Sequence, residues 1–204
     1  MGDKNMDNEV SFDTAVVDTE TLAMDDNAVV LTLSGVVFNR HQQDLLYLLD
    51  EAPATNGIGF RSFHLELNVT EQILAGRTID PGTVAWWNRQ DKAAINSIMH
   101  DRGMLFNDAA CVISDELDGV QVFFRGTDFD PPKIASLFRM VGKKAPWKYN
   151  AVRDVRTYID ALTGGTKGYL TDWKDPEWFI GHNSLHDCFR DAMQMQASTV
   201  KQSS

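Results

Sequence analysis

Hydrophobic residues gather early in the chain in two neighbouring runs. Residues 13–20 and 28–38 carry runs of Val, Leu and Ala, and the turn-forming residues 25–27 separate them. Apolar, β-branched runs bounded by such residues are typical of strands, so we expect two antiparallel strands joined as a hairpin. Over residues 63–69 apolar and polar positions alternate, which predicts a third, half-buried strand.

From residue 80 onward most apolar residues recur at helical spacing. Asp80 precedes Pro81, a pair typical of a helix start, and Asp91 is expected to cap the helix that follows. The short apolar run 120–124 is bounded by glycines, which favours a buried, parallel strand. The remaining predicted segments are a loop within 42–59, helices over 107–117, 130–141 and 158–162, a short strand or turn over 148–155, and a final helix from residue 183 or 184.

These elements predict one α/β domain with a mixed β-sheet, whose first three strands are antiparallel and which is flanked by helices. A length of 204 residues, of which 43% are hydrophobic, suits a single domain with a substantial core. We expect an acidic N-terminal tail over residues 1–12, the folded domain over 13–197 and a frayed C-terminus over 198–204.

The composition favours a cytoplasmic protein. No apolar run approaches the roughly 20 residues that a membrane-spanning helix requires, and the polar, acidic N-terminus is unlike a signal peptide. Cys111 and Cys188 both lie within amphipathic patterns, which favours reduced, buried thiols over a disulfide. We therefore expect no membrane partner, and the oligomeric state is left open.

Charge is distributed unevenly along the chain. The net charge of −10 argues against a protein that simply coats nucleic acid. Acidic residues dominate positions 1–26, whereas basic residues dominate positions 131–156. The basic stretch is either a solvated face or a track for phosphates beside an acidic metal site. Its members are Lys133, Arg139, Lys143, Lys144, Lys148, Arg153 and Arg156.

The acidic side chains of Asp18 and Glu20 end the first predicted strand. Alternate residues of a strand share a face, which places these carboxylates about 7 Å apart on one side of the sheet. They are either a solvated pair or ligands of a hard divalent cation such as Mg²⁺ or Mn²⁺. Asp130 follows the buried strand 120–124, where it is either a helix cap or a further ligand at the carboxyl end of a strand.

The start of the last helix adds two more candidates. Asp187 lies in the first turn, where an acid also interacts favourably with the helix dipole. His182 precedes it by five positions and lies just outside the helix. Taken singly, each residue has an ordinary structural role, as a dipole partner and as a surface histidine.

Together these residues form a pattern. Asp18-Thr19-Glu20, then Phe129-Asp130, then His182 with Asp187 resembles the DEDDh branch of the 3′→5′ exonucleases, which have an RNase H-like fold. The segments 125–130, 153–157 and 182–188, and the helix that carries Trp86 and Trp87, are similar to those of the subgroup found in T-even-type phages. The resemblance runs from about residue 14 to residue 195.

The resemblance implies a two-metal hydrolase. Asp18, Glu20, Asp130 and Asp187 would bind two divalent ions, Mg²⁺ or Mn²⁺. Asp18 would bridge the two ions, Glu20 and Asp187 would complete one site, and Asp130 would hold the second ion partly through water. His182 would take the proton from the attacking water. The implied substrate is the 3′ end of single-stranded DNA in the cytoplasm of an infected cell, with release of 5′-mononucleotides. The alternatives are an exoribonuclease and a catalytically silent nucleic-acid-binding protein with the same fold.

The resemblance also suggests substrate contacts. The backbones of Thr19 and Thr21 would contact the terminal nucleotide, with Arg125 and Phe129 also binding substrate. Leu22 would act as an apolar wedge against the bases, or else pack in the core. Trp86 and Trp87 are adjacent, so both cannot face the core; one of them stacks on a base, or the pair serves packing alone.

Overall fold

The computed structural model describes residues 11–42, 45, 49, 56–57, 59–100, 102–165 and 167–200. Most of the expected acidic tail, up to residue 10, lies outside the described residues, as do residues 201–204 of the expected frayed end. Residues 198–200 belong to the last helix. Within the described chain, no helix has the length and apolar character needed to cross a membrane.

The described strands form one six-stranded mixed sheet in the order β3-β4-β2-β1-β5-β6. Strand β1 is central: it pairs antiparallel with β2 and parallel with β5. Strand β2 pairs antiparallel with β4, so the expected fold class is confirmed. The strands are β1 (Thr14–Thr21), β2 (Val30–Phe38), β3 (Asn56–Gly57), β4 (Phe60–Glu66), β5 (Gln121–Phe124) and β6 (Arg153–Asp154).

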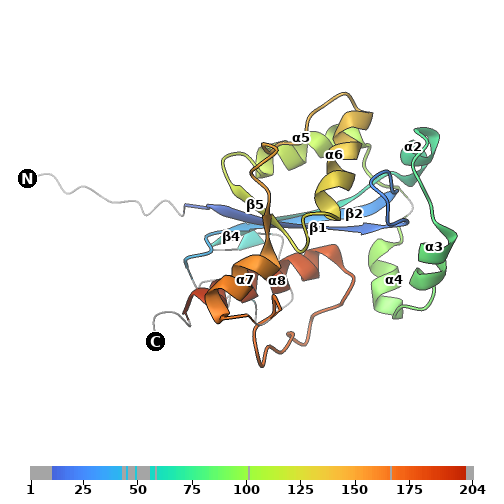
Figure 1. Cartoon of the computed structure of the whole chain (residues 1–204). Helices are drawn as coiled ribbons and strands as arrows, with labels where there is room; N and C mark the ends of the chain where they lie inside the picture. Colours follow the sequence, from blue (N-terminus) through green and yellow to red (C-terminus); the bar gives the residue numbers. More distant parts are fainter. Residues whose placement is uncertain are drawn as a thin grey trace, which may run out of the picture.

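Helices cover both faces of the sheet. Figure 1 shows α5 and α6 on one face, α7 and α8 on the other, and α2, α3 and α4 gathered at the end where β1 finishes. The helices are α2 (Val69–Leu74), α3 (Pro81–Trp87), α4 (Lys92–Ile98), α5 (Phe106–Glu116), α6 (Asp130–Met140), α7 (Val155–Thr163) and α8 (Ser184–Val200).

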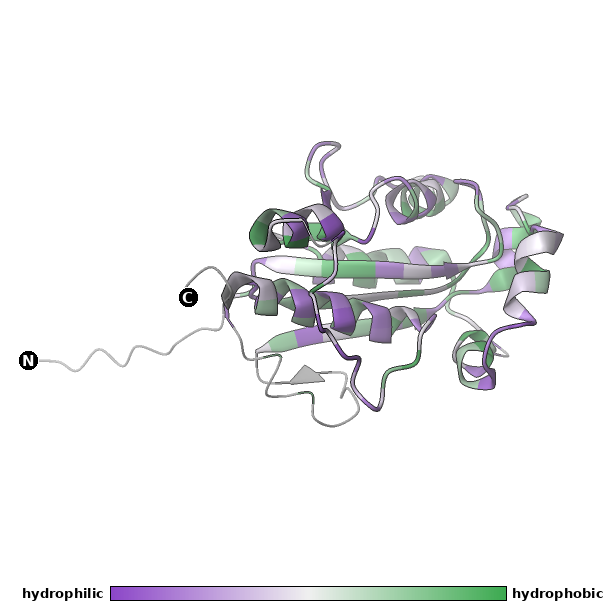
Figure 2. Cartoon of the chain, turned by 60° about the horizontal axis from the view of Figure 1, so that its bottom comes forward, coloured by the Kyte–Doolittle hydropathy of each residue, from purple (hydrophilic) through white to green (hydrophobic). Residues whose placement is uncertain are grey.

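The alternation of side chains along β1 divides the core in two. Ala15 and Val17 pack in the cluster that contains residues of α5 and α6, whereas Val16 packs in the cluster with residues of α7 and α8. Figure 2 shows hydrophobic residues running along the strands between the helical layers. Since Asp18 and Glu20 share the face of Val16, the sheet presents both acids to α8.

The structure corrects three expectations. The third strand ends at Glu66, and Val69 begins helix α2 instead, because the Asn68 side chain caps that helix by accepting a hydrogen bond from Glu71 N at 2.8 Å. The Asp91 side chain makes no capping hydrogen bond. Of the two cysteines only Cys188 is buried, whereas Cys111 is exposed.

Candidate active site

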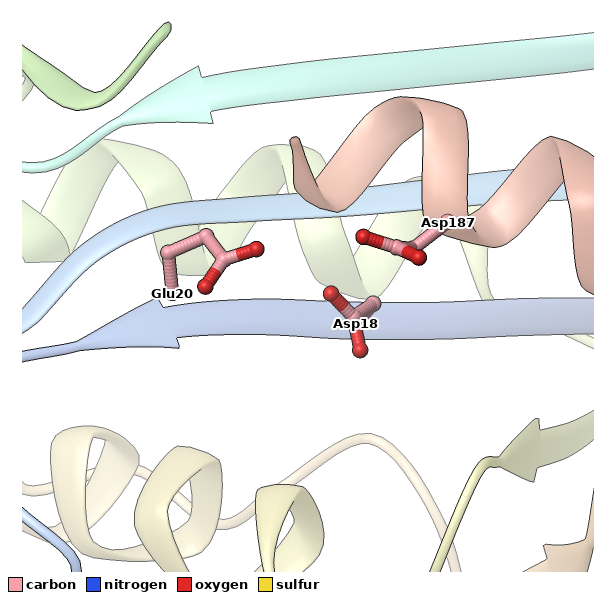
Figure 3. A group of neighbouring side chains, drawn as sticks. All are labelled: Asp18, Glu20 and Asp187. Atoms are coloured by element: carbon pink, nitrogen blue, oxygen red, sulfur yellow. The ribbon is translucent and has the colours of Figure 1, made fainter. Parts of the chain in front are cut away.

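A triad of carboxylates forms where β1 meets α8. One carboxylate oxygen from each of Asp18, Glu20 and Asp187 lies within 4.8 Å of the others. Figure 3 shows the three side chains pointing toward one another, two from the strand and one from the helix. Like charges at this separation repel strongly in a site away from bulk water, so the arrangement requires either protons or a cation.

Hydroxyl groups fix the start of α8 on the sheet. The buried Ser184 hydroxyl lies 2.9 Å from Thr32 Oγ1 and 2.7 Å from Ser34 Oγ. On β2, Thr32 pairs with Glu20 and Ser34 pairs with Asp18, so these contacts lie on the face of the sheet that carries the acids. The hydroxyl cluster therefore sets the distance from β1 to Asp187.

Asp130 joins the triad from the other helical layer. It lies in the first turn of α6, whose N-cap is Phe129, so the helix-cap interpretation of Asp130 is wrong. Its side chain is buried, and its Oδ1 accepts a hydrogen bond from Thr19 Oγ1 at 2.5 Å. The buried Lys133 ammonium lies nearby and donates to the carbonyls of Met24 and Phe129 at 2.9 and 3.2 Å. Lys133, one of the residues expected to form a phosphate track, is thus a buried side chain that bonds to the backbone.

Burial raises the pKa values of all four carboxylates. Burial raises the pKa of Asp18 well above its usual range, and Asp130, Glu20 and Asp187 raise it further. Burial and then the charge of Asp187 do the same for the pKa of Glu20. Burial raises the pKa values of Asp130 and Asp187 to about 6, although Thr19 and Arg190 respectively oppose the shift. Without a cation, the cluster therefore retains protons at pH values where isolated carboxylates have lost them.

Both oxygens of Asp187 are held by neighbours. Arg190 donates to Oδ1 at 2.6 Å from one helical turn further along α8, and the backbone N–H of His182 donates to Oδ2 at 3.0 Å. This second bond ties the loop before α8 to the carboxylate. His182 adopts a left-handed backbone conformation, with φ at +61°, which is uncommon for a residue other than glycine.

An aromatic wall stands beside His182. Its ring meets Trp86 edge to face, with centroids 4.8 Å apart. Trp87 lies behind: its side chain is buried, and its indole N–H donates to Thr21 O at 2.9 Å. Burial lowers the pKa of His182, and Arg190 lowers it further. The imidazole is consequently neutral at physiological pH and has a nitrogen free to accept a proton.

A cavity of about 840 Å³ unites these groups. All five expected catalytic residues line it, together with Thr19, Thr21, Arg125 and Phe129; the five are Asp18, Glu20, Asp130, His182 and Asp187. Leu22 is not among the described lining residues, because it packs against a core cluster that contains Leu31 and Trp87. Met24, which is 70% exposed, lines the cavity instead.

Arg125 does line the cavity, but an internal partner holds it. Its Nε lies 2.9 and 2.8 Å from the two carboxylate oxygens of Asp191, and its Nη1 donates to Gly168 O at 3.0 Å. The guanidinium also stacks over the ring of Tyr169, 4.2 Å from its centroid. Because Asp191 is 66 positions away, no local sequence pattern indicates this pair.

Sequence reasoning missed several cavity residues: Met24, Tyr169, Arg190 and Asp191. One signal was available for Arg190, since residues three apart on a helix are neighbours and Asp187 was already a candidate. Met24 and Tyr169 lie outside helices and strands, so no periodic pattern marked them.

The donor set suits a hard divalent cation. Carboxylate oxygens are the ligands that Mg²⁺ and Mn²⁺ prefer, and three of them converge within 4.8 Å. A cation bound there would favour the charged carboxylates against the burial and the mutual repulsion that raise the pKa values of Asp18 and Glu20. Asp130 is not part of this closest group, but its charge acts on both Asp18 and Glu20, so it lies near enough to serve an adjacent ion.

Comparison with known proteins places the chain in a family. Residues 13–199 match the family described as "3'-5' exoribonuclease Rv2179c-like domain". The exodeoxyribonuclease of Enterobacteria phage T4 is 23% identical over 210 residues, covering 89% of this chain and 86% of that protein.

Solved structures with a similar fold include E. coli exonuclease I. The complex with a dT13 oligonucleotide is 13% identical and superposes with a TM-score of 0.53, covering 92% of this chain. The zinc-bound form of the single-stranded DNA complex is 12% identical, with a TM-score of 0.56 over 93% of this chain. This chain spans only 40% of the length of either exonuclease I chain. The resemblance drawn from the sequence motifs is confirmed, and the chain belongs to the 3'-5' exoribonuclease Rv2179c-like domain family, within the DEDD, RNase H-like exonucleases.

Proposed function

We propose that this protein is a metal-dependent 3′→5′ exonuclease that releases 5′-mononucleotides from the 3′ end of single-stranded DNA. The observation that carries the proposal is the convergence of four carboxylates and His182 on one cavity. These side chains come from β1, α6, and α8 with the loop before it, and packing alone would not require five ionisable groups to meet there.

The carboxylates would hold two divalent ions. Asp18, Glu20 and Asp187 form the closest group and would bind one, while Asp130 would hold the second together with Asp18. When bound, a pair of ions stabilises both the attacking and the leaving oxygen of an in-line displacement at phosphorus. The chain's own part is to fix the ligands, which the bonds from Thr19 to Asp130 and from Arg190 to Asp187 already do.

His182 would act as the general base. Its backbone N–H bond to Asp187 and its contact with the Trp86 ring hold the imidazole at the edge of the cavity. The lowered pKa keeps the ring neutral near pH 7, so a ring nitrogen can accept the proton of the attacking water. The water oxygen forms the new bond to phosphorus, and the 3′ oxygen of the shortened strand leaves.

Two apolar groups would contact the terminal bases. Trp86 is only partly buried and lines the cavity, so it offers an aromatic surface on which a base can stack. Met24 takes the wedge position expected for Leu22, because Met24 is exposed at the cavity while Leu22 packs in the core.

The choice of DNA draws on the relatives. The phage T4 relative is named an exodeoxyribonuclease, and two of the similar structures hold single-stranded DNA. The family description, in contrast, names an exoribonuclease. An exoribonuclease acting with the same residues is therefore the second candidate.

Matched single-stranded DNA and RNA oligonucleotides, labelled at the 5′ end, test the proposal. With Mg²⁺ we expect the DNA to shorten stepwise from its 3′ end, and with excess EDTA we expect no digestion. Asp18→Asn and Asp187→Asn should each lower the rate by at least about 10³-fold, because each removes a carboxylate that would hold a divalent ion, and the ions stabilise the transition state. Asp115→Asn, at an exposed position on α5, is the matched control and should retain the native rate.

The outcomes separate the candidates. Shortening of the RNA alone would favour the exoribonuclease. Binding of either strand without digestion would favour the silent binding protein, and full activity of Asp187→Asn would refute the proposed metal site.

A further inference from the structure

Arg156 is a cation that projects toward the cavity from the first turn of α7. The side chain is exposed, and two glycines leave room for it. A Cβ atom at Gly168 would lie 2.6 Å from Cα and Cγ of Arg156, and one at Gly126 would lie 3.0 Å from its Nη1. Gly168 therefore packs closely against the base of the Arg156 side chain, and Gly126 lies close to its guanidinium; both glycines have positive φ angles, +78° and +107°.

Arg156 differs from the other arginines that line the cavity. Arg125 is paired with Asp191, and Arg190 is paired with Asp187. Arg156, by contrast, has neither a hydrogen bond nor an ion pair with any residue that the structure describes. A guanidinium carries five N–H donors in a planar fork that matches a phosphate group. Among the arginines in the described lining, Arg156 is therefore the one whose guanidinium is not engaged by a carboxylate.

Within the basic stretch 131–156, the surroundings of the other residues also favour Arg156 as the phosphate ligand. Lys133 is fully buried, Lys143 donates to Asn107 O, and Arg153 donates to the carbonyls of Asn150 and Val152. Seven lysines and arginines were candidates for a phosphate track. Of these seven, Arg156 alone is among the described residues that line the cavity.

We propose that Arg156 binds a backbone phosphate of the nucleic-acid strand, one residue or more upstream of the phosphate that is cleaved, and thereby positions the 3′ end over the carboxylates. This inference rests on the proposed function, since it takes a nucleic-acid strand as the ligand. A strand phosphate supplies the anion that the free guanidinium lacks, and the contact is independent of base identity. The contact also explains how a chain with a net charge of −10 binds a polyanionic strand. Arg156, together with divalent cations bound by the four carboxylates, would supply the positive charge that a basic surface supplies in other proteins.

Binding of a 5′-fluorescein-labelled oligothymidylate, with Ca²⁺ in place of Mg²⁺, tests the contact across a range of salt concentrations. Each phosphate contact on a single strand contributes about 0.7 to the slope of log affinity against log salt. Arg156→Ala should therefore reduce the slope by about 0.7 and weaken binding by about tenfold at low salt, the size expected for a charge-assisted contact. Arg156→Lys keeps the charge and should keep the slope, while losing part of the affinity.

Lys148→Ala is the matched control, because it removes the same charge from an exposed position outside the cavity lining. It should leave affinity and slope at the native values. In steady-state digestion with Mg²⁺, Arg156→Ala should raise KM by about tenfold and leave kcat within about twofold, as expected for a residue that binds ground state and transition state alike.

The two proposals fail in different ways. Equal slopes and affinities for native protein and Arg156→Ala would overturn the role of Arg156, even if the native protein digests DNA. A native protein that binds but digests neither DNA nor RNA would refute the nuclease, while the slope would still report on Arg156. A fall in kcat with unchanged KM would also exclude the binding role, and the thermal midpoint of Arg156→Ala shows whether the fold is intact.

Discussion

Trp86 and Trp87 are neighbours on α3 but have different surroundings. Trp87 is 5% exposed and bonds to β1, whereas Trp86 faces the cavity beside His182. Trp87→Ala should lower the free energy of unfolding by about 3–5 kcal/mol, the usual cost of truncating a buried aromatic residue. Trp86→Ala should instead weaken binding of an oligonucleotide by about 1–3 kcal/mol, the value of one base-stacking contact. Urea titration and fluorescence anisotropy measure the two effects.

The reverse pattern for the two tryptophans would show that the stacking surface has been assigned to the wrong residue. Equal loss of stability in both variants would mean that the pair serves packing alone.

His182→Ala should reduce kcat by about 10²–10⁴-fold, the usual contribution of a general base. Because burial lowers the pKa of His182 below its usual value, the native rate should fall only below about pH 6.5. In a plot of rate against pH, the variant should lose the part of the low-pH decrease that protonation of His182 causes. His41→Ala, at an exposed histidine outside the cavity lining, serves as the control. A native kcat in His182→Ala would exclude the base role.

At the scale of elements, Arg125 and Asp191 tie the end of β5 to α8. Their side chains are only 9% and 4% exposed. Leaving one member of a buried ion pair without its partner typically costs about 3–5 kcal/mol. Because Arg190 Nε also lies 3.5 Å from Asp191 Oδ1, Arg125→Met should lower the free energy of unfolding by at most about that amount. The double variant Arg125→Met, Asp191→Leu should recover most of the loss, because no charge remains buried and unpaired.

Urea denaturation of the single and double variants measures this coupling. A stable Arg125→Met protein that binds oligonucleotides poorly would instead restore the expected substrate-binding role of Arg125.

The predictability of each element depended on whether local chemistry or distant contacts decided it. Alternation along β1 and the Asp80-Pro81 start of α3 were visible in the sequence, and the structure has both. The strand expected over 63–69 was predicted to end too late, because the alternation of apolar and polar residues continues past Asn68, which caps α2.

The candidate site was predictable only through the order of its motifs. Nothing local brings Asp130 to Thr19, which lie 111 positions apart; the parallel pairing of β1 with β5 brings them together. The ion pair of Arg125 was unpredictable for the same reason. Its partner Asp191 lies on a different element, and the sequence does not distinguish a paired arginine from an exposed one.

For the whole molecule, the carboxylate cluster links stability to pH. Asp130 and Asp187 have pKa values of about 6 in the fold, against about 3.9 for an unfolded Asp. The folded state thus binds more protons between these values. The contribution of these groups is fully present below about pH 3.9 and is lost as pH rises through about 6. Without metal, the cluster should therefore make the protein less stable at pH 7.5 than at pH 5.5.

Thermal unfolding in EDTA checks this link. Asp187→Asn should raise the metal-free midpoint at pH 7.5 and flatten the change between pH 5.5 and 7.5. His64, His182 and His186, whose pKa values burial lowers, act in the opposite direction, but they are present in both proteins and cancel in the comparison. Mg²⁺ should raise the native midpoint at pH 7.5 through binding to the folded state and should do so less for Asp187→Asn. A variant with the native profile would contradict the linkage.

The cavity is assembled from two kinds of segment. Its carboxylates stand on β1, α6 and α8, which contribute to the two core clusters on either side of the sheet. Trp86 and Tyr169, in contrast, come from α3 and from the loop that follows α7, and neither residue belongs to those two clusters. Peripheral segments tolerate exchange better than core ones. Substitutions in these peripheral segments can therefore change which nucleotides the cavity accepts without moving the carboxylates. Chimaeras that exchange the α3 region between relatives offer a route to altered nucleobase or sugar preference.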